Sequence, residues 1–185
     1  MHVDDIVAKF TAAVHGAADP MAAAREVIDE LHGDLDAVAA ALAHLPGTGG
    51  NAKQAFHRTP QLSLLKVCFP AGRRTPPHNH GTWATILVFS GHERNTLYRQ
   101  DDAGTLRRAS EVELARGSIL PMRAEAVHVA ECLGDEPAIG LHVYGADVLA
   151  TTRHMWDPES LERQPLDWTK YELLAQRASA MEAAP

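Results

Sequence analysis

The chain has 185 residues, of which 45% are hydrophobic, and a formal net charge of −7. This length fits one domain with terminal additions and is enough to bury a core. The negative charge, without a cluster of Lys or Arg, argues against a nucleic-acid-binding protein. No segment approaches the ~20 apolar residues of a membrane span. The start of the sequence lacks the basic residues and apolar run of a signal peptide.

Two cysteines, Cys68 and Cys132, are too few for a disulfide framework. We therefore expect reduced thiols and a cytoplasmic protein. The sequence leaves open whether the protein is a monomer or a homo-oligomer.

Both ends of the chain have the patterns of helices. Apolar residues recur at helical spacing from Val3 to Val14, and Asp19-Pro20 is typical of an N-cap followed by proline at the first helical position. A third stripe covers residues 35–45, and another helix follows Trp168. We predict a helical N-terminal arm over 1–50 and a C-terminal helical extension over 161–185, both serving as scaffold.

The middle of the chain, residues 51–160, changes to short strands separated by turns. A loop is expected at 46–50 and a hairpin turn at Asp101–Gly104. Many short strands at regular spacing indicate an all-β sandwich or barrel. The predicted strands cover residues 62–69, 84–90, 93–99, 107–114, 118–121, 126–133 and 138–144.

Three histidines stand at the edges of apolar runs in this region. His78 and His80 flank one residue just before the β-branched run at 84–89. Residues i and i+2 of a strand point to the same face, so both imidazoles would project into one space. His128 follows a second run that opens at Gly117. Three neutral nitrogen donors converging inside a barrel would make a metal site with open coordination positions.

The spacing around the first two histidines resembles the first motif of the cupin superfamily. Gly72, His78, His80 and Gly91 fall in register with that family's glycine, His-x-His and second glycine. Ala84 stands where the family has a glutamate.

The second cupin motif is matched more loosely. Gly117, Pro121 and His128 are similar to it, the glycine between the last two is missing, and Cys132 replaces the usual terminal asparagine. The resemblance implies a single cupin barrel (a double-stranded β-helix or jelly roll) over residues 51–160.

A cupin with three histidines and no carboxylate resembles the thiol dioxygenases, which include cysteine dioxygenase and 3-mercaptopropionate dioxygenase. Residues 136–146 are similar to that family's Glu-Pro-Ala…His-x-Tyr segment, which implies outer-sphere catalytic roles for His142 and Tyr144. Gly140 stands where many members carry the serine of a Ser-His-Tyr chain, so the full relay is in question. The cysteine needed for a Cys–Tyr crosslink is absent near Ala84, and no crosslink is expected.

The same resemblance offers two arginines for a substrate carboxylate, which a guanidinium can bind bidentately. Arg58 is at the position where cysteine dioxygenases carry their carboxylate-binding arginine. Arg153, nine residues after Tyr144, is at the position used by 3-mercaptopropionate dioxygenases. Because both are present, the sequence does not decide between the two thiols.

The function predicted on these grounds is that of an iron(II)-dependent thiol dioxygenase, with Fe(II) held by His78, His80 and His128. It would oxidise a small thiol carboxylate, cysteine or 3-mercaptopropionate, to its sulfinate with O2. Neutral imidazoles leave the ferrous ion its full charge, which favours thiolate binding and lowers the thiol's pKa.

Three alternatives stay open at this point. One is a three-His cupin dioxygenase that cleaves a carbon–carbon bond, for example in a diketone. Another is a non-oxidative isomerase or lyase, since three histidines also suit zinc. The third is a small-molecule sensor with a vestigial site. The metal bound in the cell is not fixed by the ligands alone, because affinity follows the Irving–Williams order.

Overall fold

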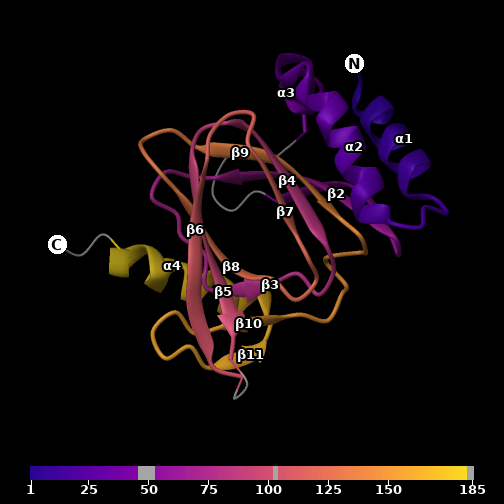
Figure 1. Ribbon diagram of the computed structural model, residues 1–185. Coiled ribbons are helices and arrows are strands. Elements are labelled where there is room, and N and C mark those ends of the chain that lie inside the picture. The colour runs from indigo at the N-terminus through magenta and orange to yellow at the C-terminus, as the bar shows by residue number, and fades with distance from the viewer. Residues whose placement is uncertain (46–52, 102–103, 183–185) are drawn as a thin grey trace.

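Two antiparallel sheets face each other in the computed structural model, which describes residues 1–45, 53–101 and 104–182 (Figure 1). The strand orders are β1-β2-β9-β4-β7 and β11-β10-β3-β8-β5-β6. This is the predicted double-stranded β-helix, with helices at both ends of the chain. The strands are β1 Lys53–Thr59, β2 Leu62–Phe69, β3 His78–Asn79, β4 Ala84–Ser90, β5 Glu93–Gln100, β6 Leu106–Leu114, β7 Ile119–Met122, β8 Val127–Cys132, β9 Ala138–Tyr144, β10 His154–Trp156 and β11 Arg163–Pro165.

Both faces of the five-stranded sheet are covered. One face forms the barrel interior, where Val67 and Ile86 are fully or almost fully buried. On the other face, Leu64 and Leu87 pack into a second core with the N-terminal helices. Strand β2 is consequently buried at every position, which explains why six of its eight residues are apolar and do not alternate regularly with polar ones.

The N-terminal helices begin as the sequence predicts and lie against the outside of this sheet (Figure 1). They are α1 Val3–Val14, α2 Pro20–His32 and α3 Leu35–Leu42. The Asp19 carboxylate accepts from the backbone N–H of Ala22 at 3.0 Å and so caps α2. Lys66 of β2, only 5% exposed, donates from Nζ to the carbonyl of Leu42 at 3.0 Å. This bond ties the end of α3 to the sheet.

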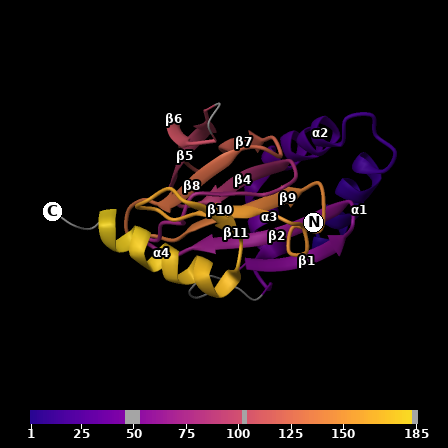
Figure 2. The same cartoon turned by 90° about the horizontal axis from the view of Figure 1, so that it is seen from below.

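The fourth helix, α4 Trp168–Glu182, lies on the other side of the molecule, away from α1–α3 (Figure 2). Its residues Tyr171 and Leu174 are buried and pack with Met155 of β10. The C-terminal helix therefore covers the sheet that contains β3 and β10.

The sequence pattern suggested that the first histidine motif is part of one continuous strand, but the structure divides it between two strands. Strand β3 contains only His78 and Asn79 and belongs to the six-stranded sheet, whereas β4 begins at Ala84 in the other sheet. Gly81 makes the change of direction with φ +66°, and a Cβ there would lie 2.6 Å from the carbonyl oxygen of Thr152. The chain crosses between the sheets inside the motif because a glycine permits this turn.

Other elements lie outside the sequence-based prediction or outside the described residues. Strands β1, β10 and β11 were not predicted; the last two have three residues each, too few for a periodicity. The predicted loop at 46–50 lies outside the described residues, as do residues 102–103 of the predicted hairpin turn. At its ends, Gly104 donates from its backbone N–H to the carbonyl of Asp101 at 2.8 Å.

Three general expectations from the sequence can be set beside the structure. Cys68 and Cys132 are both free and buried. None of the helices in the described ranges is long and apolar enough to cross a membrane. The boundaries at residues 50 and 160 stay predictions, although the N-terminal helices and the sheet share one hydrophobic core.

Candidate metal centre

The three predicted histidines converge inside the barrel. Strand β3 pairs with β8 so that His78 lies directly opposite His128, and His80 follows β3 immediately. One ligand atom from each of the three lies within 4.8 Å of the others. The Nε2 atoms of His80 and His128 are 3.2 Å apart, a spacing that one metal ion can bridge with bonds of about 2.1 Å. All three side chains are buried, with exposures of 5%, 3% and 2% in chain order.

Hydrogen bonds turn two of these imidazoles toward the centre. His78 donates from Nδ1 to the carbonyl of Pro76 at 3.0 Å, and His128 donates from Nδ1 to Oδ1 of Asn95 at 2.8 Å. Because Nδ1 carries the proton in both rings, each Nε2 keeps its lone pair for a ligand. The Nδ1 atom of His80 has no hydrogen-bond partner among the described residues.

The donor set is neutral. Burial lowers the pKa of His80 well below its ordinary value, and the neighbouring imidazoles of His128 and His78 lower it further. Neutral imidazole is the form that binds metals. Within the described residues the cluster contains no carboxylate. Ala84, at the position where the first cupin motif has a glutamate, is fully buried and lies between Tyr144 and Met122 in the sheet register. Among the described residues, this group therefore offers three nitrogens and no acid.

The His-x-Tyr segment lies on the inner face of β9, beside the histidines. The ring centroid of Tyr144 is 5.1 Å from that of His80, and its hydroxyl is 3.1 Å from Nδ1 of His142. Both side chains are buried, and burial raises the pKa of Tyr144. A Cβ on Gly140 would lie 3.1 Å from the carbonyl oxygen of Leu87 and 3.3 Å from Nε2 of His142, so a side chain at this position would require its neighbours to shift.

Arg153 is held next to the histidine motif by the backbone that follows it. The backbone N–H of His154 donates to Oδ1 of Asn79 at 2.8 Å, and that of Trp156 donates to the carbonyl of Pro77 at 2.8 Å. These bonds join β10 to β3 on both sides of the first ligand. The segment that carries Arg153 is therefore fixed relative to the metal centre.

The guanidinium of Arg153 is a buried cation. The residue is 8% exposed, and it forms no ion pair with any carboxylate of the described ranges. Burial lowers its pKa, while the phenols of Tyr144 and Tyr171 raise it; its charge also contributes to the lowered pKa of His80. It lies over the ring of Trp168, 4.8 Å from the centroid.

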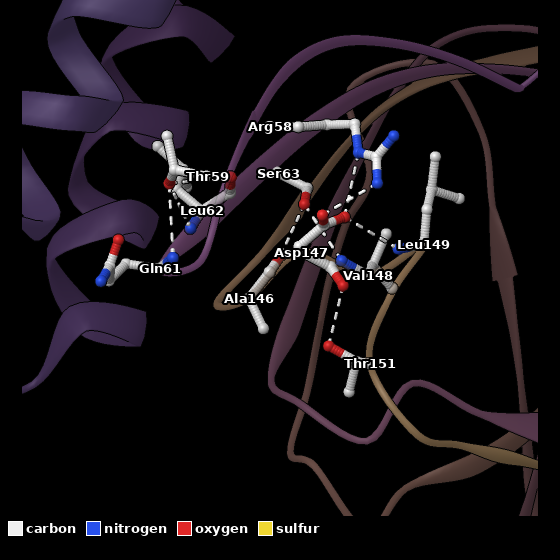
Figure 3. Close-up of polar contacts among 10 residues, drawn as sticks. All are labelled: Arg58, Thr59, Gln61, Leu62, Ser63, Ala146, Asp147, Val148, Leu149 and Thr151. Atoms are coloured by element: carbon white, nitrogen blue, oxygen red, sulfur yellow. Dashed lines mark hydrogen bonds and ion pairs between the residues drawn. The ribbon is translucent and has the colours of Figure 1, made fainter.

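Arg58 is placed quite differently: it is exposed and faces Asp147 (Figure 3). Its guanidinium donates from Nε and Nη2 to the two carboxylate oxygens of Asp147, at 3.0 and 2.8 Å. Its side chain is 46% exposed. The turn that includes Asp147 is also held by Ser63, whose hydroxyl accepts from the backbone N–H of Val148 at 3.1 Å. Arg58 is thus engaged in fastening the turn that precedes Arg153, and we assign it no contact with a substrate.

Two aromatic residues of α4 belong to the site and were interpreted from the sequence only as scaffold. Tyr171 is fully buried, and its ring centroid lies 5.4 Å from that of His78. Trp168 contacts both Tyr171 and Arg153. Their spacing of three residues predicts one face of a helix, but no local signal could show that this face would lie next to His78.

No protein-family model matches the chain. Solved structures with a similar fold include an RmlC-like cupin protein from Methanocaldococcus jannaschii (12% identity, 55% of this chain and 85% of that one, TM-score 0.45). A double-stranded β-helix protein from Klebsiella pneumoniae has 20% identity over 60% of this chain and 82% of its own, with TM-score 0.47. The DMSP lyase DddQ from Ruegeria pomeroyi has 20% identity over 55% and 46%, with TM-score 0.44. By its strand order and its paired sheets, the chain has the double-stranded β-helix fold of the cupins, with a buried three-histidine group at its centre.

Proposed function

We propose that this protein is an iron(II)-dependent thiol dioxygenase that converts a short thiol carboxylate, 3-mercaptopropionate in preference to cysteine, to its sulfinate. The observation that carries the proposal is the guanidinium of Arg153, buried beside the histidine cluster without a carboxylate partner among the described residues. A buried charge that the protein does not neutralise is a candidate for ligand binding.

The three imidazoles fit a ferrous ion, because their ligand atoms lie close together around a common point and, within the described residues, the group contains no carboxylate that would reduce the charge there. When bound, a ferrous ion would hold thiolate and dioxygen side by side and supply the redox chemistry that adds both oxygen atoms to sulfur. The overall reaction, thiolate plus O2 to sulfinate, balances without a further reductant.

The protein's own groups bind and orient the substrate. Arg153 receives the carboxylate through two charge-assisted hydrogen bonds, and Trp168 keeps the guanidinium plane in place. With the proton of His142 on Nδ1, that ring donates to the oxygen of Tyr144, 3.1 Å away, and the phenol hydrogen is then free to bond a group held next to His80. The raised pKa of Tyr144 keeps the phenol protonated, so that it acts as a donor.

The preference for 3-mercaptopropionate over cysteine rests on charge. The arginine at the cysteine dioxygenase position, Arg58, is bound to Asp147 at the surface. The α-ammonium of cysteine would enter a buried space that already contains the cation of Arg153, and the histidine cluster contains no carboxylate to receive it within the described residues. A substrate without the ammonium avoids this cost.

The test is oxygen uptake by protein loaded anaerobically with Fe(II), with the product identified by mass spectrometry. We expect thiol-dependent uptake with 3-mercaptopropionate, less with cysteine, and very little with cysteamine, which has no carboxylate. A lack of uptake with every thiol at full iron occupancy would contradict the proposal. Cleavage of a diketone, or activity with Zn²⁺ alone, would favour a carbon–carbon-cleaving or a non-oxidative enzyme instead.

A further inference from the structure

A second buried ionisable group, Glu93, lies inside the barrel and is connected to the histidine cluster through the side chain of Asn95. Glu93 is the first residue of β5 and is 1% exposed. It lies opposite Cys132 of β8, while Asn95 lies opposite Ala130 and Leu97 opposite His128. Glu93 and Asn95 therefore occupy the same inward-facing row of the sheet as the third ligand.

Hydrogen bonds connect this row. Asn95, which is fully buried, donates from Nδ2 to Oε2 of Glu93 at 3.3 Å. The other end of the same amide, Oδ1, accepts from Nδ1 of His128 at 2.8 Å. The order is thus carboxylate, amide, imidazole, with each proton pointing toward the carboxylate end.

The direction of the amide determines which nitrogen of His128 carries the proton. If the amide of Asn95 were reversed, its NH2 group would face Nδ1 and require a lone pair there. The proton of the neutral ring would then be on Nε2, which lies 3.2 Å from Nε2 of His80, and no lone pair would point at the metal position.

Glu93 removes this ambiguity, because a carboxylate oxygen accepts hydrogen bonds and does not donate them. Its Oε2 requires the NH2 end of Asn95, which leaves only Oδ1 for His128. Oε1 has no hydrogen-bond partner among the described residues. A proton on Oε1 would leave Oε2 an acceptor, so the orientation is the same in both ionisation states.

We propose that Glu93 and Asn95 are positioning residues that fix the tautomer of His128 and so prepare its Nε2 for the metal. Of the two ligands oriented by hydrogen bonds, His78 relies on a backbone carbonyl, which no substitution of a side chain removes. His128 depends on two side chains, and these can be exchanged. The inference depends on the proposed metal centre but not on the identity of the thiol.

The test measures the affinity of the metal-free protein for Co²⁺ by competition with a chelator, for Glu93→Gln, Asn95→Leu and the double variant Glu93→Gln/Asn95→Asp. Glutamine has the size of glutamate but can donate as well as accept, so it no longer dictates the amide's orientation. We expect Glu93→Gln to weaken Co²⁺ binding about 10-fold and Asn95→Leu about 10- to 100-fold, as for other outer-sphere partners of metal ligands.

The double variant is the sharpest part of this test. The aspartate introduced by Asn95→Asp would accept from His128 whatever its orientation. The glutamine introduced by Glu93→Gln would donate to that aspartate. The hydrogen-bonded row is then restored, with the amide at position 93 and the acid at position 95. We expect the Co²⁺ affinity of the double variant to return to within about threefold of the wild-type value. A residue that only fills space would give no such rescue.

The control is Thr96→Val. Thr96 is next to Asn95 on β5, points to the other face and donates to Glu111 at 3.1 Å; its replacement should leave Co²⁺ affinity unchanged. The ¹⁵N shifts of the His128 ring in metal-free protein provide a second readout, with the proton on Nδ1 in the wild type and a mixture in Glu93→Gln.

The inference is overturned if Glu93→Gln and Asn95→Leu bind Co²⁺ as tightly as Thr96→Val, if the double variant is not rescued, or if His128 of the wild type carries its proton on Nε2. Should Asn95→Leu fail to fold, the single variant Glu93→Gln and the double variant still decide. Failure of the thiol activity would leave all of these measurements unaffected, so the two proposals can fail separately.

Discussion

At the surface of this molecule, Arg58 is paired with an opposite charge, whereas two ionisable side chains inside the barrel, Arg153 and Glu93, are not paired within the described residues. Arg58 and Asp147 form a two-bond ion pair in contact with water. Arg153 and Glu93 are 8% and 1% exposed, and neither forms an ion pair within the described residues. Isolated buried charges lower the stability of a fold. Their position near the three histidines supports the ligand and metal sites that we propose.

Lys66 is an intermediate case that makes the comparison more informative. It is as buried as Arg153, but its ammonium is satisfied by the carbonyls of Leu42 and Leu45 at 3.0 and 3.3 Å. Burial of a cation is therefore not by itself a sign of function in this protein. What distinguishes Arg153 is a buried cation beside which the described residues place the ring of Trp168 but no anion.

The largest effect, on kcat/KM, is expected when each of the two arginines is replaced in turn. Arg153→Met should lower kcat/KM for 3-mercaptopropionate by about 10²- to 10³-fold, since a buried charge-assisted contact contributes about 2–5 kcal/mol. Arg58→Met should change it by less than about threefold. Steady-state oxygen uptake with both variants checks this. Equal losses in the two would remove the distinction between the paired and the unpaired arginine.

The next effect is on the pH dependence of stability, which we expect to change when Glu93 is replaced. Burial raises the pKa of Glu93 to about 7, from an ordinary value of 4.5. A carboxyl group with a raised pKa in the folded state stabilises that state fully below pH 4.5, and this contribution is lost as the pH rises through 7. Glutamine cannot ionise. Glu93→Gln should therefore gain stability over the wild type as the pH rises from about 4.5 to 8.

One pKa unit corresponds to about 1.4 kcal/mol, so the gain should approach about 3 kcal/mol. Urea unfolding of the metal-free proteins at several pH values measures it. The exposed Glu113→Gln on the neighbouring strand is the matched control and should show no such gain. A pH-independent difference for Glu93→Gln would show that the carboxyl group is not buried as described.

A smaller effect on stability is expected from replacing Lys66, the buried cation that is hydrogen-bonded to carbonyl groups. Lys66→Met should destabilise the protein by about 1–3 kcal/mol, because two carbonyl groups at the end of α3 lose a charged donor. Arg153→Met, which removes a cation without such partners, should leave the stability unchanged or raise it. Thermal unfolding of the two variants side by side tests this. A loss for Arg153→Met as large as that for Lys66→Met would mean that Arg153 is stabilised inside the protein after all.

The smallest effect should come from the surface pair. Arg58 lowers the pKa of Asp147 through its hydrogen bonds, so the pair stabilises the fold above the ordinary carboxyl pKa and loses this effect as the pH falls. Asp147→Asn should lower Tm by less than about 3 °C at pH 7 and by less at pH 3. Calorimetry at both values, with and without added salt, would detect it. A larger decrease would give the turn before Arg153 a greater structural role than we infer.

Local patterns were enough to predict much of this protein. The apolar stripes predicted α1 and α2, and Asp19-Pro20 predicted where α2 begins, because these signals lie within a few residues of each other. The apolar runs predicted β2, β4 and β9 with the bounds observed. The two-residue spacing of His78 and His80 and the resemblance to the two cupin motifs predicted that these residues and His128 form a cluster, and the structure brings the three together.

The tertiary structure alone decided what surrounds the cluster. Arg58 and Arg153 are both candidates in the sequence, and only the fold brings Asp147, 89 positions from Arg58, to neutralise one of them. The edge-to-face contact of Tyr171 with His78 and the row from Glu93 to His128 likewise join residues that are far apart along the chain. Such partnerships depend on register and on the packing of α4, which the sequence pattern does not specify, and burial then makes each of them energetically important.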